Sequence, residues 1–163
     1  MCWQVAGKLF NMDKKIIDLS FYKSRFKLFF SITSAVLVIC YLLVYFNYGL
    51  MKNQTYAEQV KNLFMILLIG SAVFYSFWQQ KQRREMLKIM DFQSRVLAYK
   101  KIYLSRLYWH MLSGVVSSII YLTTSRRLFL IFAVLDLITM MLVYPNKFVF
   151  KRELMDDEIE FVD

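Results

Sequence analysis

Apolar residues in this chain are gathered into four long blocks rather than spread along it. The blocks are residues 28–50, 62–78, 107–123 and 128–144. A helix needs about 20 mainly apolar residues to cross a bilayer, and the three shorter blocks reach that length by recruiting flanking residues or by letting Lys and Arg side chains snorkel. Because 58% of the 163 residues are hydrophobic, the composition is unlike that of an ordinary soluble domain. The sequence therefore predicts an all-α membrane protein with four transmembrane helices, paired as two helical hairpins.

The net charge of +9 is distributed unevenly around these blocks. Basic residues crowd the segment before the first block and the connection at 79–106, whereas the other two connections hold few. Lys and Arg are retained on the cytoplasmic side of a membrane protein. We therefore expect both termini and the connection at 79–106 to face the cytoplasm, with the protein in a bacterial inner membrane.

The connection at 79–106 contains no Gly or Pro and consists mostly of good helix formers. It is predicted to continue the second helix out of the membrane and to return as the start of the third. We expect the reversal near 91–94, with Asp91 or Ser94 as the cap of the returning helix. Its basic side chains either bind lipid headgroups or form a solvated loop that only sets the topology. The headgroup set is Lys81, Arg83, Arg84, Lys88, Lys100, Lys101 and Arg106.

One face of the third block carries small and polar residues. His110, Ser113, Gly114, Ser117 and Ser118 recur at helical spacing, so they share this face. Small residues four positions apart let helix backbones approach closely in lipid. Ser113, Gly114, Ser117 and Ser118 are therefore predicted to form a helix-packing face, either within this chain's own bundle or against a partner.

Asp136 lies near the middle of the fourth block. A charged carboxylate at that depth is costly, so it is expected to face inward and to be paired or protonated. At 1.5 Å per residue, Asp136 is level with Ser113 to Ser117, while His110 is about 7 Å nearer the cytoplasm, which favours a hydroxyl partner over the imidazole. The predicted intramembrane polar site, a candidate ion or proton site, comprises Asp136, His110, Ser113, Ser117, Ser71 and Ser34. A packing role for Asp136 and His110 is the alternative.

The two flanks, 1–27 and 145–163, are expected on the cytoplasmic side. Residues 13–27 predict either a short interfacial helix or a solvated basic flank, and Met12 is an alternative start of the chain. Pro145 ends the last span, and Asn146 is a predicted cap. The acidic end of the tail either docks onto the basic arms of the connection at 79–106 or forms a disordered, solubilising extension.

A resemblance covers about a third of the chain, from Tyr99 to Leu154. The matching positions are Lys100, Lys101 and Arg106 before the third span, and Pro145, Lys147, Arg152, Glu153 and Leu154 after the fourth. In these positions the chain resembles small uncharacterised four-helix inner-membrane proteins of Bacteroidota. It departs from them at Thr124-Ser125-Arg126, which replaces a Gly-Asn turn, and at Ser113-Gly114, where an acidic residue often precedes the Gly. The resemblance implies a four-helix fold and a bacterial source, and it implies no activity.

Function classes can be ranked by the chemistry that the sequence lacks. It has one histidine, no Cys/His cluster with metal-ligand spacing and no Gly-rich phosphate loop, so we expect no enzyme, cofactor or metal site. The basic residues are explained by topology, which disfavours nucleic acid. The leading hypothesis is a non-catalytic membrane protein acting through helix association, as a homo-oligomer or as an accessory subunit. The alternatives are a small proton or cation transporter or channel that uses Asp136, and membrane-surface sensing through anionic lipids.

Overall fold

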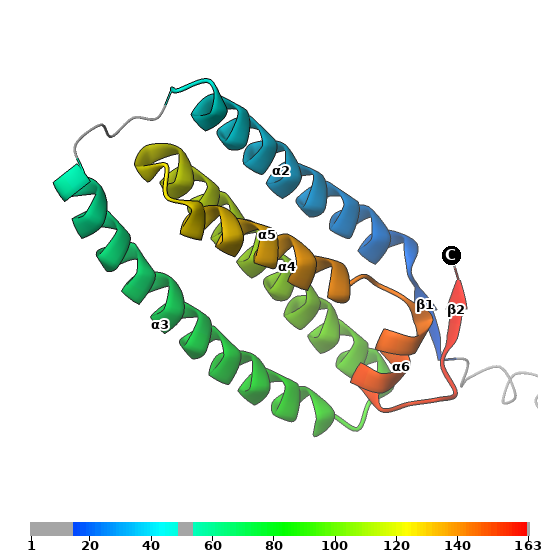
Figure 1. Cartoon of the computed structure of the whole chain (residues 1–163). Coiled ribbons are helices and arrows are strands. Elements are labelled where there is room, and N and C mark those ends of the chain that lie inside the picture. The colour runs from blue at the N-terminus through cyan, green and yellow to red at the C-terminus, as the bar shows by residue number, and fades with distance from the viewer. Residues whose placement is uncertain (1–14, 49–53, 163) are drawn as a thin grey trace, which may run out of the picture.

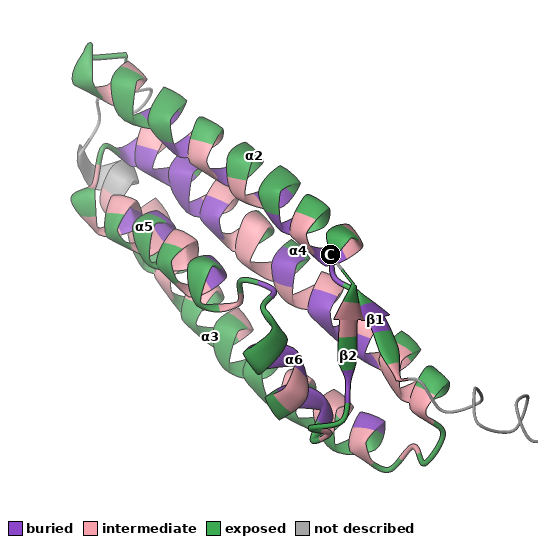
Figure 2. Cartoon of the chain, turned by 90° about the vertical axis from the view of Figure 1, so that its right-hand side faces the viewer, coloured by how far each residue is buried: buried purple, intermediate pink, exposed green. Residues whose placement is uncertain are grey.

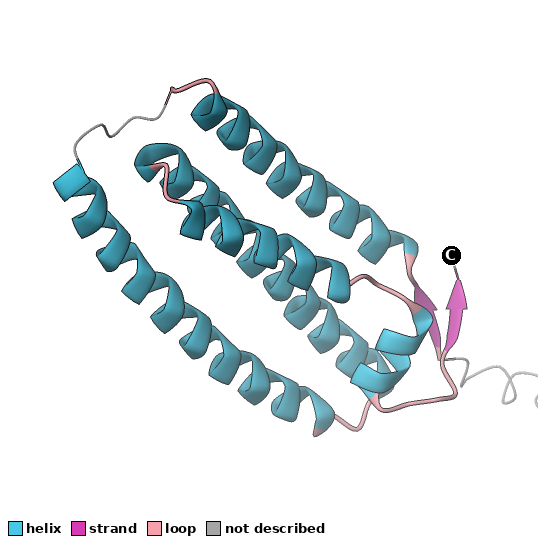
Figure 3. Ribbon diagram, in the orientation of Figure 1, coloured by secondary structure: helices cyan, strands magenta, loops and turns pink. Residues whose placement is uncertain are grey.

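A computed structural model describes residues 15–48 and 54–162 as a bundle of long helices with a small sheet at one end (Figures 1 and 3). The alternative start at Met12 lies outside the described residues. Within them are five helices and two short strands. Their bounds are β1 (Ile16–Asp18), α2 (Ser20–Tyr45), α3 (Gln54–Leu87), α4 (Phe92–Thr124), α5 (Arg127–Leu142), α6 (Lys147–Leu154) and β2 (Glu160–Val162). The all-α prediction is confirmed apart from this small sheet.

Helix α4 is the centre of the bundle and packs extensively against α2 and α5, and less extensively against α3. Helix α3 runs along the other helices with much of its surface uncovered (Figure 2). Ile66 and Phe74 on α3 are each 73% exposed. Large apolar side chains in such positions are costly in water but not in lipid.

Two helices are long and apolar enough to cross a membrane: α2 and the part of α3 from Glu58 to Leu87. A third span results if α5 and α6, which meet at 83°, count as one. These candidate spans suggest a membrane protein. Helix α4 does not meet the same test on apolarity because it carries the polar face described above, and that face is turned into the bundle, where Ser117 and Ser118 are fully buried. Four membrane crossings therefore stay a prediction.

The helix bounds confirm the helical connection and show that the first predicted span begins within a longer helix. Helix α2 begins at Ser20 and ends at Tyr45, after which Asn47 adopts a left-handed conformation with φ of 63°. The membrane crossing at 28–50 stays a prediction. The connection at 79–106 is helical except for a turn between Leu87 and Phe92. Asp91 caps α4, as predicted, by accepting a hydrogen bond from the Ser94 backbone N–H at 2.8 Å. Hydrogen bonds from Ser94 also lower the pKa of Asp91.

The N-terminal flank was predicted to be either a short interfacial helix or a solvated basic segment, and both predictions are wrong for residues 16–18. They form β1, which pairs in parallel with β2, with Ile17 opposite Phe161. Ile17 and Leu19 are 3% and 1% exposed because they enter the apolar core beneath the sheet. A parallel partner far along the chain leaves no local signal in a three-residue strand, so the pattern of the flank alone did not predict it.

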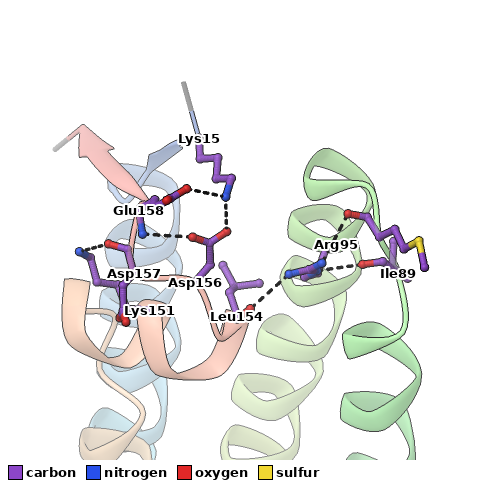
Figure 4. A network of polar contacts seen from close by, with 9 residues as sticks. Lys15, Ile89, Arg95, Lys151, Leu154, Asp156, Asp157 and Glu158 are labelled. Carbon is purple, nitrogen blue, oxygen red and sulfur yellow. Dashed lines mark hydrogen bonds and ion pairs between the residues drawn. The ribbon is translucent and has the colours of Figure 1, made fainter. Parts of the chain in front are cut away.

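The tail is docked, and over the described residues it is not a disordered extension. Asn146 caps α6, as predicted, by accepting from the Val149 N–H at 2.8 Å. Lys15 Nζ lies 2.8 Å from Asp156 and 3.1 Å from Glu158, which ties the N-terminal strand to the tail (Figure 4). This pairing raises the pKa of Lys15 and lowers that of Asp156. The predicted docking onto the basic connection at 79–106 is made by Glu153 on α6, which pairs with Arg83 and Arg106. The more distal acidic residues Asp156 and Glu158 pair with Lys15 instead.

Gly114 lies at a close approach of α4 to two neighbouring helices. A Cβ atom added to Gly114 would lie 2.7 Å from Thr33 Cγ2 on α2 and 3.5 Å from Asp136 Cβ on α5. The fully buried Thr33 cannot easily turn away, because its χ1 is restricted by β-branching and its hydroxyl donates to the Phe29 carbonyl at 2.9 Å. Three helices therefore meet at a point where only glycine fits.

We predict that Gly114→Ala lowers the free energy of unfolding by about 1–2 kcal/mol, because the overlap with Thr33 outweighs the better helix propensity of Ala. The measurement is thermal or denaturant unfolding of the purified protein in detergent. Adding Thr33→Ser, which removes Cγ2 and keeps the hydroxyl, is expected to recover most of the loss. Gly70→Ala is the matched control because a Cβ there meets nothing within 4 Å. A Gly114→Ala protein as stable as the Gly70→Ala protein would contradict the close contact.

Candidate functional site

The Asp136 carboxylate is held between two side chains of α4. Ser113 Oγ donates to Asp136 Oδ2 at 2.7 Å, and His110 Nδ1 lies 3.3 Å from Asp136 Oδ1. His110 and Ser113 are three residues apart, so they stack on one face of α4. Both carboxylate oxygens therefore have a polar partner, as a polar group inside an apolar bundle requires.

The predicted hydroxyl partner of Asp136 is confirmed, and the imidazole of His110, which the depth estimate disfavoured as a partner, contacts Asp136 as well. The depth estimate compared backbone positions only. Asp136 is level with Gly114, and the imidazole of His110, one helical turn away, is long enough to cover that distance.

Thr139 is a member of the cluster that sequence reasoning missed. Its Oγ1 lies 3.3 Å from His110 Nδ1 and donates within α5 to the carbonyls of Leu135 and Asp136. Because the hydroxyl hydrogen is used in this way, Oγ1 can only accept from the imidazole, which assigns the ring hydrogen facing Asp136 and Thr139 to Nδ1. The spacing of three residues between Asp136 and Thr139 is the signal that could have found it.

Of the other three predicted site residues, Ser117 lies close to the Asp136 cluster, whereas Ser71 and Ser34 do not. Ser117 is fully buried, and its Oγ has no hydrogen-bond partner among the described residues. Ser71 donates to the Leu68 carbonyl of its own helix at 2.9 Å and lies outside the cavity described next. Ser34 is only half-buried, because Thr33 is the α2 residue that faces α4 at this level. Ser34 lines neither the cavity at Asp136 nor the apolar groove between α3 and α4, both of which are described below. Ser71 and Ser34 are thus not part of the Asp136 cluster.

Asp136, His110, Ser113 and Thr139 line a cavity of about 410 Å³ between α3, α4 and α5. Ser117 lies in its wall as well. The aromatic part of the wall is a stacked pair, Tyr75 on α3 and Trp109 on α4, with ring centroids 4.4 Å apart and planes at 9°. The other lining residues are mainly apolar: Leu68, Ile69, Ala72, Val73, Phe132 and Leu135, with Ser76 and Gln79 as further polar members. The carboxylate therefore faces a cavity rather than a sealed helix contact.

The predicted helix-packing face is used inside the chain. Gly114 contacts α2 and α5, Ser117 and Ser118 are fully buried, and Ser118 donates to the Gly114 carbonyl at 2.7 Å. This answers the question that the sequence left open: the face packs this chain's own bundle.

The predicted headgroup residues do not form one surface. Arg83 and Arg106 pair with Glu153. Lys100 lies over the Phe21 ring at 4.0 Å, and Lys101 lines a separate hollow near the turn between α3 and α4. Lys81 and Arg84 are exposed on α3, and Lys88 is exposed in the turn that follows it. Together with Lys101, which is exposed as well, they stand clear of protein partners among the described residues.

No group of three or more His, Cys, Asp or Glu side chains over residues 15–48 and 54–162 has the arrangement of a metal site. No family model, curated protein or solved structure matches the chain. Function is therefore inferred from the geometry of the Asp136 cavity.

We predict an energetic coupling of about 1 kcal/mol between Ser113 and Asp136, because the Ser113 hydroxyl donates to a carboxyl group. It is measured as a double-mutant cycle of Ser113→Ala and Asp136→Ala by unfolding in detergent, because alanine removes the acceptor oxygens. Ser118→Ala is the matched control, since its hydroxyl donates within α4 and is expected to show no coupling to Asp136→Ala. Equal coupling for Ser113 and Ser118 would contradict the Ser113 contact.

Proposed function

We propose that this chain is a non-catalytic, four-span protein of a bacterial inner membrane that binds and passes protons or cations at Asp136. The observation that supports this function is the cavity: Asp136 lies in its wall with His110 and Ser113 holding its two oxygens. A carboxyl group inside a bundle that is neither sealed nor paired to an Arg or Lys in the described residues is typical of an ion or proton pathway.

The proposed arrangement in the membrane follows from the ends of the helices. Helices α2, α3, α4 and α5 are the four spans, with the sheet, α6 and the turn between α3 and α4 in the cytoplasm. The exposed cations Lys81, Arg84 and Lys88 lie near that turn, in agreement with retention of basic residues on the inner side. The angle of 83° between α5 and α6 would lay α6 along the membrane surface. The resemblance to Bacteroidota membrane proteins supports the same arrangement.

The chemistry of the cluster suits reversible ion binding. In a low-dielectric bundle the negative charge of an ionised Asp136 has to be compensated by a bound cation or removed by protonation. The hydroxyl of Ser113 and the Nδ1–H of His110 orient the carboxylate. Exchange of one positive charge at Asp136 is thus the elementary step of the proposed transport.

We predict that Asp136→Asn reduces proton or monovalent-cation uptake into proteoliposomes at least about tenfold, because the amide cannot ionise. Uptake is measured with a pH-sensitive dye and, separately, with radiolabelled monovalent cations. Asp91→Asn is the matched control, since Asn caps a helix as well as Asp and this residue lies outside the cavity. Uptake by the Asp136→Asn protein equal to that of the wild type would contradict the proposal.

Helix association, as a homo-oligomer or as an accessory subunit, remains a second proposal, and one observation favours it. An apolar groove of about 290 Å³ lies between α3 and α4, lined by Phe64, Leu67, Leu68, Ser71, Trp109, Leu112, Ser113 and Val116. Leu67 and Leu112 in this groove are 54% and 57% exposed. A helix of a second copy or of another membrane subunit would cover such a groove. The face at Gly114 is not available for this role because it is buried in the chain itself.

If association uses this groove, replacing Leu67 and Leu112 with Ala weakens it at least about tenfold, since each change removes buried apolar surface. Native mass spectrometry of protein extracted in mild detergent measures the species present and identifies any bound subunit. The control is Leu142→Ala, an exposed leucine outside the groove. A monomer in the wild type and in all variants would argue against association.

A further inference from the structure

We infer that the cavity at Asp136 binds a small organic ammonium cation. This inference rests on the proposed function, because it names the substrate class of the same site. Three features carry it: the charge of the cavity, its aromatic wall, and its size and opening.

The charge of the cavity fits a single positive charge. Among the described residues that line it, Asp136 is the only acidic one, and His110 and Tyr75 are the only other titratable groups. The Asp136 side chain is 17% exposed, so it reaches the cavity while remaining largely buried. A monovalent cation would therefore neutralise the carboxylate without leaving a second unpaired charge in the bundle.

The aromatic wall supplies a second attraction for an organic cation. Tyr75 and Trp109 stack on each other and both line the cavity. Aromatic rings attract ammonium groups through their negative faces, and tryptophan does so best. The Tyr75 hydroxyl accepts from Gln79 Nε2 at 2.9 Å and lies 3.3 Å from Ser105 Oγ, so hydrogen bonds fix the ring before any ligand arrives.

The lining of the cavity favours an organic cation over a bare metal cation as the main ligand. Metal cations are held by a shell of oxygen atoms, several of them usually carboxylate oxygens. Among the described residues that line the cavity Asp136 is the one carboxylate, and no group of three or more His, Cys, Asp or Glu side chains in the described part of the chain could hold a metal ion. The wall is otherwise mainly apolar, which suits the alkyl or aryl groups of an organic cation.

The size and the opening of the cavity agree with this class. A volume of about 410 Å³ lies within the range of pockets for small molecules, about 300–1,000 Å³. At the rim, Ile69, Val73 and Leu135 are 51%, 51% and 48% exposed. An apolar rim on helices that face lipid would admit an amphipathic cation from the bilayer.

The test uses the full chain in nanodiscs and titrates benzyltrimethylammonium by calorimetry, with protein-free discs as the blank. Neopentylbenzene, which replaces the ammonium nitrogen by carbon, is the uncharged isostere and is expected to bind at least about tenfold more weakly. Asp136→Asn is expected to weaken binding of the cation at least about tenfold, and Trp109→Leu about 3- to 30-fold. Phe77→Leu is the matched control: Phe77 is 68% exposed and does not line the cavity, so binding should change less than about twofold.

Folding of each variant is checked by its melting transition, and Trp109→Phe replaces Trp109→Leu if the latter does not fold, with an intermediate loss expected. Equal binding of the uncharged isostere, or binding unaffected by Asp136→Asn or by the Trp109 variant, would overturn the inference. Proton uptake that depends on Asp136 without any binding of benzyltrimethylammonium overturns the inference and leaves the proposed function standing. Binding that shows the expected pattern, without any uptake, supports the inference and contradicts transport.

Discussion

The contact among Gly114, Thr33 and Asp136 determines how the bundle is assembled. Because a Cβ on Gly114 would overlap Thr33, α2 packs against the α4 backbone there with no room for a side chain. The same position brings α5 against α4 with Asp136 directed at Ser113 and His110. The packing of α2 and α5 against α4 and the polar cluster around Asp136 therefore both depend on the absence of a side chain at Gly114.

The looser placement of α3 gives the bundle its cavity. Helices α2, α4 and α5 bury their contact faces against one another, while α3 packs mainly against α4 and to a smaller extent. Space remains between α3 and the α4/α5 hairpin, and the Tyr75–Trp109 stack spans part of it. A tightly packed fourth helix would have sealed Asp136, so the position of α3 is what exposes the carboxylate to a ligand.

The end of the bundle that carries the sheet is held by contacts between segments far apart in the chain. Strand β1 pairs with β2, Lys15 bridges to Asp156 and Glu158, and Arg95 donates to the carbonyls of Ile89 and Leu154 (Figure 4). Tyr22, Tyr99, Tyr103 and Phe150 pack as a buried aromatic cluster beneath this sheet. These contacts anchor α6 to the ends of α2 and α4.

The sequence by itself determined the long helices, a cap at Asp91 or Ser94 and the face shared by His110, Ser113 and Gly114, because periodicity and capping are local properties of the chain. It also favoured a hydroxyl partner for Asp136, since an isolated carboxylate in a bundle is costly and Ser113 lies at the same depth. Only the tertiary structure decided that His110 and Thr139 join it, that Thr33 rather than Ser34 faces Gly114, and that the flanks pair as a sheet. Those outcomes depend on the rotation and offset of helices and on partners distant in sequence, and no local pattern encodes them.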